Sequence, residues 1–120
     1  MIAIFYIYSY LNKYEYLRQL FVKESIFISE ITRVEVLGYH KLNSEEDRYF
    51  RDVFNFIPVI FPSQEIFDAS IIIRKTYNLK LGDSIIAATA YVNNLLIYTR
   101  NISDFERVKS IKCINPINLI

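Results

Sequence analysis

Cysteine, glycine and proline are scarce in this 120-residue chain, which has one Cys, two Gly and three Pro. The single Cys113 excludes an internal disulfide framework and a zinc site built from cysteines. Because Cys113 lies in an apolar stretch, we expect a buried free thiol and a reducing, cytoplasmic setting. The few glycines and prolines leave little room for long loops.

Long apolar runs and a strong net charge are also missing. No run approaches the roughly 20 residues of a membrane span. The apolar start, residues 1–8, is short and lacks a basic lead, so we do not expect a secretion signal. The net charge of +1 does not predict any particular partner, and a nucleic acid would have to bind a local basic patch rather than a globally basic surface. With 52% hydrophobic and 22% charged residues, we expect one folded domain, residues 1–120.

Helix and strand signals alternate along the chain, which predicts an α/β fold with a parallel sheet covered on both faces. Ser29 is a candidate N-cap, and Asn43 with Glu46 resembles a capping box. Residues 2–6 are either a short strand or the start of a helix. We expect strands at 26–28, 58–61, 95–99 and 112–115, helices at 7–22, 29–38, 43–56, 62–77 and 83–93, and a helical turn at 104–105.

Three acidic residues, Glu35, Asp83 and Asp104, lie at the edges of separate helices and strands. Segments that follow parallel strands meet at one edge of the sheet, so the three carboxylates are expected in one cleft. Carboxylates that converge from separate elements are typical of Mg²⁺ or Mn²⁺ sites. We therefore expect them within roughly 10 Å of one another, near enough for one ion to reach all three.

Each acid also has a structural interpretation. Glu35 can be a solvated residue at the border of an apolar helix face. Asp83 can cap a helix, where its charge suits the positive helix end, and this role is compatible with a site. Asp104 can cap the turn before Phe105. The one histidine, His40, sits at a helix end, where the helix dipole favours it.

At this point the chain resembles a known family, the PIN-domain proteins, and most closely its VapC-type toxins. The resemblance rests on three motifs in order and on Asn115-Pro116, and it covers residues from about 7 to 116. The motifs are Ser29-x-Ile31-Thr32-x-x-Glu35, Asp83-x-Ile85-Ile86-Ala87-Ala88-Thr89-Ala90 and Thr99-x-Asn101-x-x-Asp104-Phe105.

The resemblance implies a three-layer α/β/α sandwich with a parallel sheet. It implies a Mg²⁺- or Mn²⁺-dependent ribonuclease that cuts RNA such as tRNA, that is typically a dimer, and that a small antitoxin inhibits. By motif, Glu35, Asp83 and Asp104 match the catalytic and metal-binding acids. Thr99 and Asn101 match polar supporting positions, although Asn101 is equally well a turn residue.

A group of basic residues follows the third motif: Arg100, Arg107, Lys109 and Lys112. They lie near the Asp104 edge, where they would either contact phosphates or form a solvated surface. Glu106 dilutes their charge.

The chain departs from the family at its start, where members have a strand that ends in Asp-Thr-Asn or Asp-Ser-Asn. A count without gaps puts Ile2 at the Asp position and Ile4 at the Asn position, so we expect a first strand that is short or missing. Either the gene model starts too late, or the protein is truncated or degenerate. The alternative function is therefore a non-catalytic PIN fold that binds an antitoxin or RNA.

The tyrosines in and just before the first expected helix are too many for one buried face, and some are candidates for a dimer or antitoxin surface. They are Tyr6, Tyr8, Tyr10, Tyr14 and Tyr16.

Overall fold

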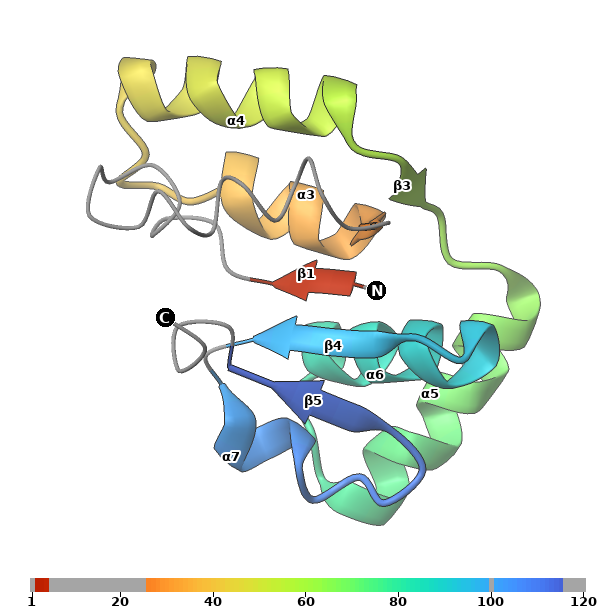
Figure 1. Cartoon of the computed structure of the whole chain (residues 1–120). Helices are drawn as coiled ribbons and strands as arrows, with labels where there is room; N and C mark the ends of the chain where they lie inside the picture. Colours follow the sequence, from red (N-terminus) through yellow and green to blue (C-terminus); the bar gives the residue numbers. More distant parts are fainter. Residues whose placement is uncertain (1, 5–25, 100, 116–120) are drawn as a thin grey trace.

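The computed structural model describes residues 2–4, 26–99 and 101–115. Figure 1 shows the arrangement of its helices and strands. In chain order they are β1 (Ile2–Ile4), β2 (Ile28–Ser29), α3 (Glu30–Leu37), α4 (Ser44–Phe56), β3 (Val59–Ile60), α5 (Gln64–Tyr77), α6 (Leu81–Asn93), β4 (Leu96–Thr99), α7 (Ile102–Phe105) and β5 (Lys112–Ile114).

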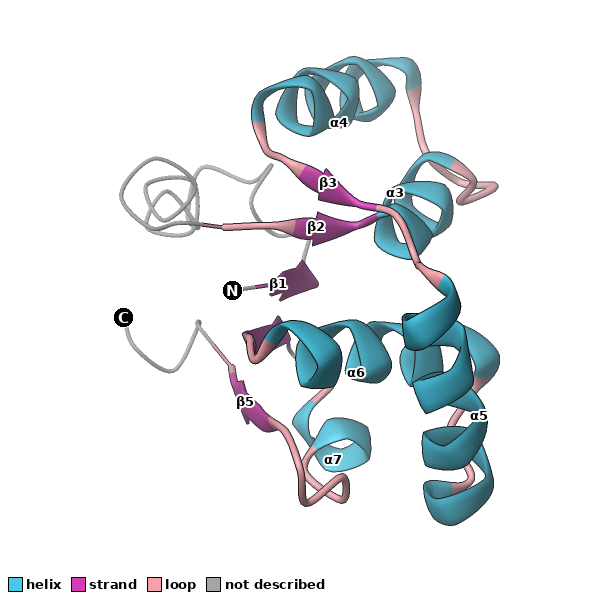
Figure 2. Cartoon of the chain, turned by 90° about the vertical axis from the view of Figure 1, so that its right-hand side faces the viewer, coloured by secondary structure: helices cyan, strands magenta, loops and turns pink. Residues whose placement is uncertain are grey.

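All strand pairs among the described residues are parallel. β1, β4 and β5 form one sheet with β4 in the middle, and β2 pairs with β3. β1 also contacts β2, so the two sheets adjoin. Helices α3, α5 and α6 lie on one side of these strands (Figure 2). The predicted α/β class with parallel strands is confirmed.

Local capping signals account for several helix starts. The Ser29 hydroxyl accepts a hydrogen bond from the Ile31 amide at 3.1 Å, and the Asn43–Glu46 capping box is present. The start of α6 was predicted wrongly at Asp83. This helix begins at Leu81 after Lys80, which makes no side-chain capping bond, and Asp83 lies within the first turn.

Most other expected elements lie within two residues of their observed bounds, but β2 falls later than predicted. Its two residues come directly before α3, so Ser29 both ends the strand and caps the helix. The helix expected at 7–22, with its tyrosines, lies outside the described residues.

The first strand is short rather than missing. Ile2 pairs with Ile97 and Ile4 pairs with Thr99. Ile2 and Ile4, which the count without gaps places at the family's Asp and Asn positions, are the first and last residues of this strand. An acid that followed this strand would fall beyond Ile4, and the first Asp or Glu in the sequence is Glu15.

Two apolar clusters hold the elements together. One packs α5, α6, β4 and Phe105 of α7, and the other packs β2, α3 and α4 against Tyr98 of β4. Helix α6 is the most enclosed, with residues 84–90 all buried. Asp83 immediately precedes this buried run, so its position is tied to the core.

Candidate active site

Glu35 on α3 lies against the first turn of α6. A Cβ atom added at Gly82 would come within 3.0 Å of Oε2 of Glu35 and within 3.6 Å of Cγ2 of Ile31. The 3.0 Å approach to Glu35 is tighter than nine in ten real Cβ contacts, so the absent side chain of Gly82 leaves room for the Glu35 carboxylate. Although Glu35 as a whole is exposed, its carboxylate therefore loses part of its water shell.

Burial and neighbouring charges raise the pKa of both Glu35 and Asp83. Burial raises the pKa of Glu35, and the nearby Asp83 charge raises it further. Burial also raises the pKa of Asp83, Asp104 adds to that rise, and Lys80 opposes it. Both shifts have the same cause, a carboxylate that is partly desolvated and has an anionic neighbour.

Asp104 is held in a polar turn after β4. The side-chain Nδ2 of Asn101 donates a hydrogen bond to Asp104 Oδ2 at 2.8 Å. The backbone N–H of Asn101 donates a hydrogen bond to Thr99 Oγ1 at 2.9 Å. Thr99 is 2% exposed and lies beside the carboxyl end of β1, through its pairing with Ile4. Thr99, Asn101 and Asp104 thus form one hydrogen-bonded group at this edge of the sheet.

The three predicted acids are connected in a row, with Asp83 in the middle. Glu35 and Asp83 interact through their charges, as do Asp83 and Asp104. Among residues 2–4, 26–99 and 101–115, however, no group of three or more His, Cys, Asp or Glu side chains could hold one metal ion.

The donor chemistry of this row nevertheless fits a hard cation. Mg²⁺ keeps several waters and usually takes only one or two protein carboxylates together with phosphate oxygens of a substrate. Glu35 and Asp83 supply two such carboxylates. In the described part of the chain, neither forms a hydrogen bond through its side chain or an ion pair. A cation would relieve their repulsion.

Glu30 shows what a structural acid looks like on the same helix. Its carboxylate accepts hydrogen bonds from Nε of Arg33 at 2.8 and 3.0 Å, and it also pairs with Nη2 of Arg33. These hydrogen bonds lower the pKa of Glu30. The negative charge of Glu30 is therefore balanced by Arg33 within the fold. The charged form of Glu35 is instead disfavoured, and a raised pKa of this kind is typical of functional groups.

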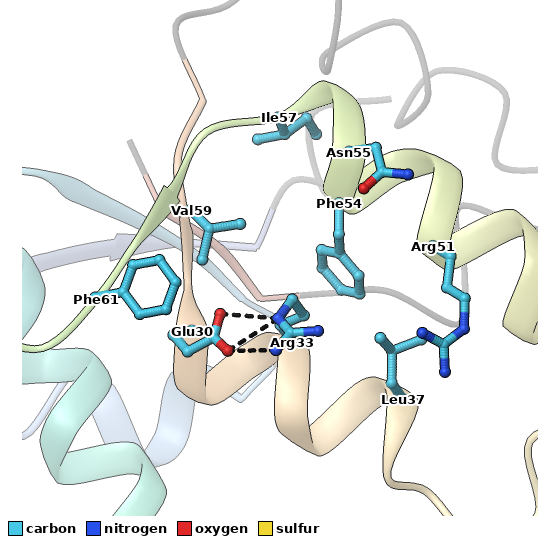
Figure 3. A pocket seen from close by; sticks show the side chains of 9 residues that line it. All are labelled: Glu30, Arg33, Leu37, Arg51, Phe54, Asn55, Ile57, Val59 and Phe61. Atoms are coloured by element: carbon cyan, nitrogen blue, oxygen red, sulfur yellow. Dashed lines mark hydrogen bonds and ion pairs between the residues drawn. The ribbon is translucent and has the colours of Figure 1, made fainter.

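A cavity of about 560 Å³ lies between α3, α4 and β3, and the Glu30–Arg33 pair projects into it (Figure 3). None of Glu35, Asp83 and Asp104 lines it. Its second guanidinium, that of Arg51, pairs with Asp47 at 2.8 Å. Because each of its cations already has a carboxylate partner, this cavity is a poor site for an anion.

The basic residues near Asp104 do not act as one patch. Nη1 of Arg107 donates to the Tyr77 carbonyl at the end of α5 at 2.8 Å, and its Nη2 lies 3.9 Å from Oδ1 of Asp104. Lys109 and Lys112 are exposed, and Arg100 lies outside the described residues. Cys113 is a free thiol but only half-buried, so the expected full burial was wrong.

Sequence reasoning missed Gly82, and although it named Arg107 near Asp104, it missed the contact of Arg107 with the end of α5. Gly82 makes room for Glu35, and the signal for it was a rare glycine directly before Asp83 in an apolar helix. Arg107 links Asp104 to the end of α5, and only the fold brings these segments together.

One buried hydroxyl on α3 also lacks a partner among the described residues. Thr32 is 1% exposed, and no hydrogen-bond partner of its Oγ1 lies within the described part. It lies one helical turn before Glu35, on the same face.

Comparison with known proteins agrees with the motif pattern. The family model described as "PIN domain" matches residues 2–111. Ribonuclease VapC1 of Rickettsia felis is 28% identical over 99 residues, covering 72% of this chain and 72% of the relative.

Solved structures share the fold along nearly the whole chain. A toxin–antitoxin complex from Klebsiella pneumoniae is 28% identical, with a TM-score of 0.76 over 96% of this chain and 95% of the other. DNA-bound VapBC from Salmonella typhimurium is 21% identical, with a TM-score of 0.80 over 94% and 96%.

Proposed function

Because this chain belongs to the PIN-domain family, we propose that it is a toxin ribonuclease of the VapC type that uses Mg²⁺ or Mn²⁺. The observation that carries this proposal is the contact of Glu35 with the first turn of α6, where burial raises the pKa of both Glu35 and Asp83 and the Asp83 charge adds to the rise at Glu35. Such a pair is unfavourable for the fold alone and favourable for a cation.

In this proposal Glu35 and Asp83 hold the cation, and Asp104 completes the acidic row from the other side of Asp83. A bound cation lowers the pKa of a coordinated water and offsets charge on the scissile phosphate. Asn101 holds the Asp104 carboxylate in place through its side-chain amide, and Thr99 holds Asn101 through its hydroxyl. Arg100 is the candidate for contact with the RNA backbone.

The proposed partners are an RNA substrate such as tRNA, a cognate antitoxin, and a second copy of this chain in a homodimer. The printed names of the Klebsiella and Salmonella structures support the antitoxin, since both describe toxin–antitoxin assemblies. No helix among the described residues is both long and apolar enough to cross a membrane. We keep a cytoplasmic location as part of the proposal.

A second candidate function is a non-catalytic PIN fold that binds an antitoxin or RNA. The observation that favours it is the absence of Asp and Glu from residues 1–14, which include β1 and the positions that follow it. A hard-cation site with one carboxylate fewer binds its ion more weakly and positions the attacking water less well.

The test is cleavage of labelled tRNA by the 120-residue chain with Mn²⁺, against an EDTA control. We expect slow, metal-dependent cleavage that Glu35→Gln and Asp83→Asn each abolish. Asp52→Asn is the matched control, because Asp52 is an exposed acid on α4. Cleavage that survives both site substitutions would exclude these carboxylates as the site.

Metal binding separates the two candidates when cleavage is absent. If Mn²⁺ raises the melting temperature of the wild type and of Asp52→Asn but not of Asp83→Asn, the site holds a cation. No cleavage and no metal-dependent shift would favour the non-catalytic candidate.

A further inference from the structure

Arg107 lies at one end of the acidic row and uses few of its hydrogen-bond donors within the described part of the chain. Its neighbours Phe105 and Val108 are 1% and 0% exposed, so the backbone that carries it is fixed in the core. Nη1 donates to the Tyr77 carbonyl at 2.8 Å. Nη2 lies 3.9 Å from Oδ1 of Asp104, which is beyond hydrogen-bond distance. The guanidinium is therefore oriented by the fold and still has N–H groups for another anion.

Lys80 places a second cation at the same edge. It comes directly before α6, and its carbonyl accepts a hydrogen bond from the Ser84 amide at 2.9 Å. The preceding Leu79 is 3% exposed, so the turn between α5 and α6 is anchored on both sides of Lys80. The Lys80 side chain is exposed and forms no ion pair with a described residue. Its charge nevertheless opposes the rise in the pKa of Asp83, so the two side chains are near each other.

The turn between α5 and α6 brings the two cations together. Tyr77, whose carbonyl holds Arg107, ends α5, and Lys80 follows three residues later. Arg107 lies beside Asp104. Lys80 lies beside Asp83, the neighbour of Asp104 in the acidic row. The two basic side chains therefore flank the same end of the row.

These two cations change the charge that an RNA strand would meet. In their charged forms, the three carboxylates and one divalent ion together carry a single negative charge, which would repel a phosphodiester. The two basic side chains turn this into a single positive charge, which one phosphodiester would balance. RNA bound at the acidic row therefore needs cations of this kind close by.

We propose that Lys80 and Arg107 bind the RNA backbone phosphate next to the scissile one, on the α5–α6 side of the acidic row. Arg107 supplies an oriented guanidinium that suits two oxygens of one phosphate, and Lys80 supplies a compact charge on a flexible side chain. At the other end of the row, no described cation alters the pKa of Glu35, so the contact is one-sided within the described part. The inference rests on the proposed function for its ligand, RNA, but it concerns binding rather than cleavage.

The test is RNA binding measured without cleavage. Asp83→Asn serves as the background, with EDTA present, because the proposed nuclease would not cut RNA under these conditions. Fluorescence anisotropy of a labelled single-stranded RNA gives the dissociation constant at several salt concentrations. We expect Lys80→Gln and Arg107→Gln each to make the plot of log affinity against log salt shallower by about 0.7, the contribution of one phosphate contact on a single strand. Each should also weaken binding by roughly tenfold at low salt.

Two matched controls remove the same charges elsewhere. Arg48→Gln and Lys41→Gln replace exposed cations on α4 and in the loop before it. Figures 1 and 2 show α4 at the opposite end of the molecule from α7. Both controls should leave the salt dependence unchanged.

Arg107→Lys separates phosphate binding from support of the turn at Tyr77. It keeps the charge but loses the planar fork, so the salt dependence should be kept while the affinity falls. A purely structural role of Arg107 would instead lower the melting temperature of Arg107→Gln and leave its salt dependence unchanged, which would contradict the proposal.

The proposal is supported if both site substitutions, and neither control, reduce the salt dependence. It is overturned if the background protein does not bind RNA at about 50 mM salt, if either site substitution leaves the salt dependence unchanged, or if the controls reduce it equally. The tRNA cleavage assay with Mn²⁺ is read separately. Cleavage without any role of the pair in binding would reject this inference alone, whereas binding that depends on the pair without cleavage would reject only the nuclease proposal.

Discussion

Helices α5 and α6 follow each other in sequence, pack against each other and have nearly equal lengths, yet they depend on different interactions. α5 is capped by Ser63, whose hydroxyl accepts a hydrogen bond from the Ile66 amide at 3.2 Å, and only Ile66, Ser70 and Ile73 are buried. α6 has no side-chain cap but buries seven consecutive residues. Local signals thus define α5, whereas tertiary burial defines α6.

This difference has a functional side. The buried helix α6 carries Asp83 and contacts Glu35. A functional site on these two residues would need them to be held rigidly, and burial of α6 provides that. Helix α5 instead leaves Phe67, Ile71 and Ile72 exposed to solvent. The two adjacent helices therefore differ in how far burial fixes the position of their side chains.

The largest expected effect is loss of core packing in α6. Ile86→Ala removes a side chain that is 0% exposed, so we expect the free energy of unfolding to fall by about 2–5 kcal/mol. Ile72→Ala, on the exposed side of α5, should change it by less than about 0.5 kcal/mol. Urea unfolding of both variants measures the difference, and equal losses would contradict the contrast between the helices.

The next effect concerns the helix starts. Ser63→Ala removes the cap of α5, and we expect a loss of about 1 kcal/mol in the free energy of unfolding. Lys80→Ala occupies the same place before α6 but removes no capping bond, so the loss should stay within about 0.5 kcal/mol. Urea unfolding again reports both values. A larger loss for Lys80→Ala would show that α6 also needs a local start signal.

The sequence revealed these two kinds of start unequally. Ser29, and Asn43 with Glu46, indicate their helices through capping chemistry, which acts over three or four residues and is visible in a linear sequence. The start of α6 depends on burial against other elements, so capping chemistry alone points to Asp83, two residues after the observed start at Leu81.

The candidate site divides in the same way. The motifs identified Glu35, Asp83 and Asp104. They also identified Thr99 and Asn101, whose hydrogen bonds connect them to Asp104 within five residues of the chain. The contact between Glu35 and the turn at Gly82 joins segments almost fifty positions apart, and neither segment alone indicates the other. The register of β1 was likewise fixed only by its pairing with β4.

A smaller effect on the free energy of unfolding is expected from the acids in the first turns of the two helices, Glu65 in α5 and Asp83 in α6. Asp83→Asn should stabilise the protein at pH 7, because burial and Asp104 raise the pKa of Asp83 and so disfavour its charged form. Glu65→Gln should instead destabilise it slightly, since Glu65 is exposed and its charge suits the helix dipole.

The pH dependence of Asp83→Asn gives the sign independently. With a raised pKa in the folded state, the unfavourable contribution of Asp83 is complete above that pKa. It fades as the pH falls toward the ordinary value of 3.8. Thermal melts between pH 4 and 8 should therefore show the largest gain from Asp83→Asn at neutral pH. A gain that grows toward pH 4 would contradict the cause assigned to the shift.

The smallest effect concerns the helix ends, which are alike. Asn78 ends α5 and Asn94 ends α6, both with φ of 53° in the left-handed region. Glycine also adopts this conformation readily, so Asn78→Gly and Asn94→Gly should each change the free energy of unfolding by no more than about 0.5 kcal/mol. Urea unfolding of the pair checks this, and a difference above about 1 kcal/mol between them would show that the ends contribute to the contrast.

Gly82 places stability and activity in opposition at one position. It lies inside α6, where alanine would favour the helix by roughly 0.5–1 kcal/mol. The same methyl group would press on the carboxylate of Glu35. A screen that selected only for thermal resistance would therefore favour replacement of this glycine, and the replacement would shift the Glu35 carboxylate of the proposed metal site without altering any ionisable group.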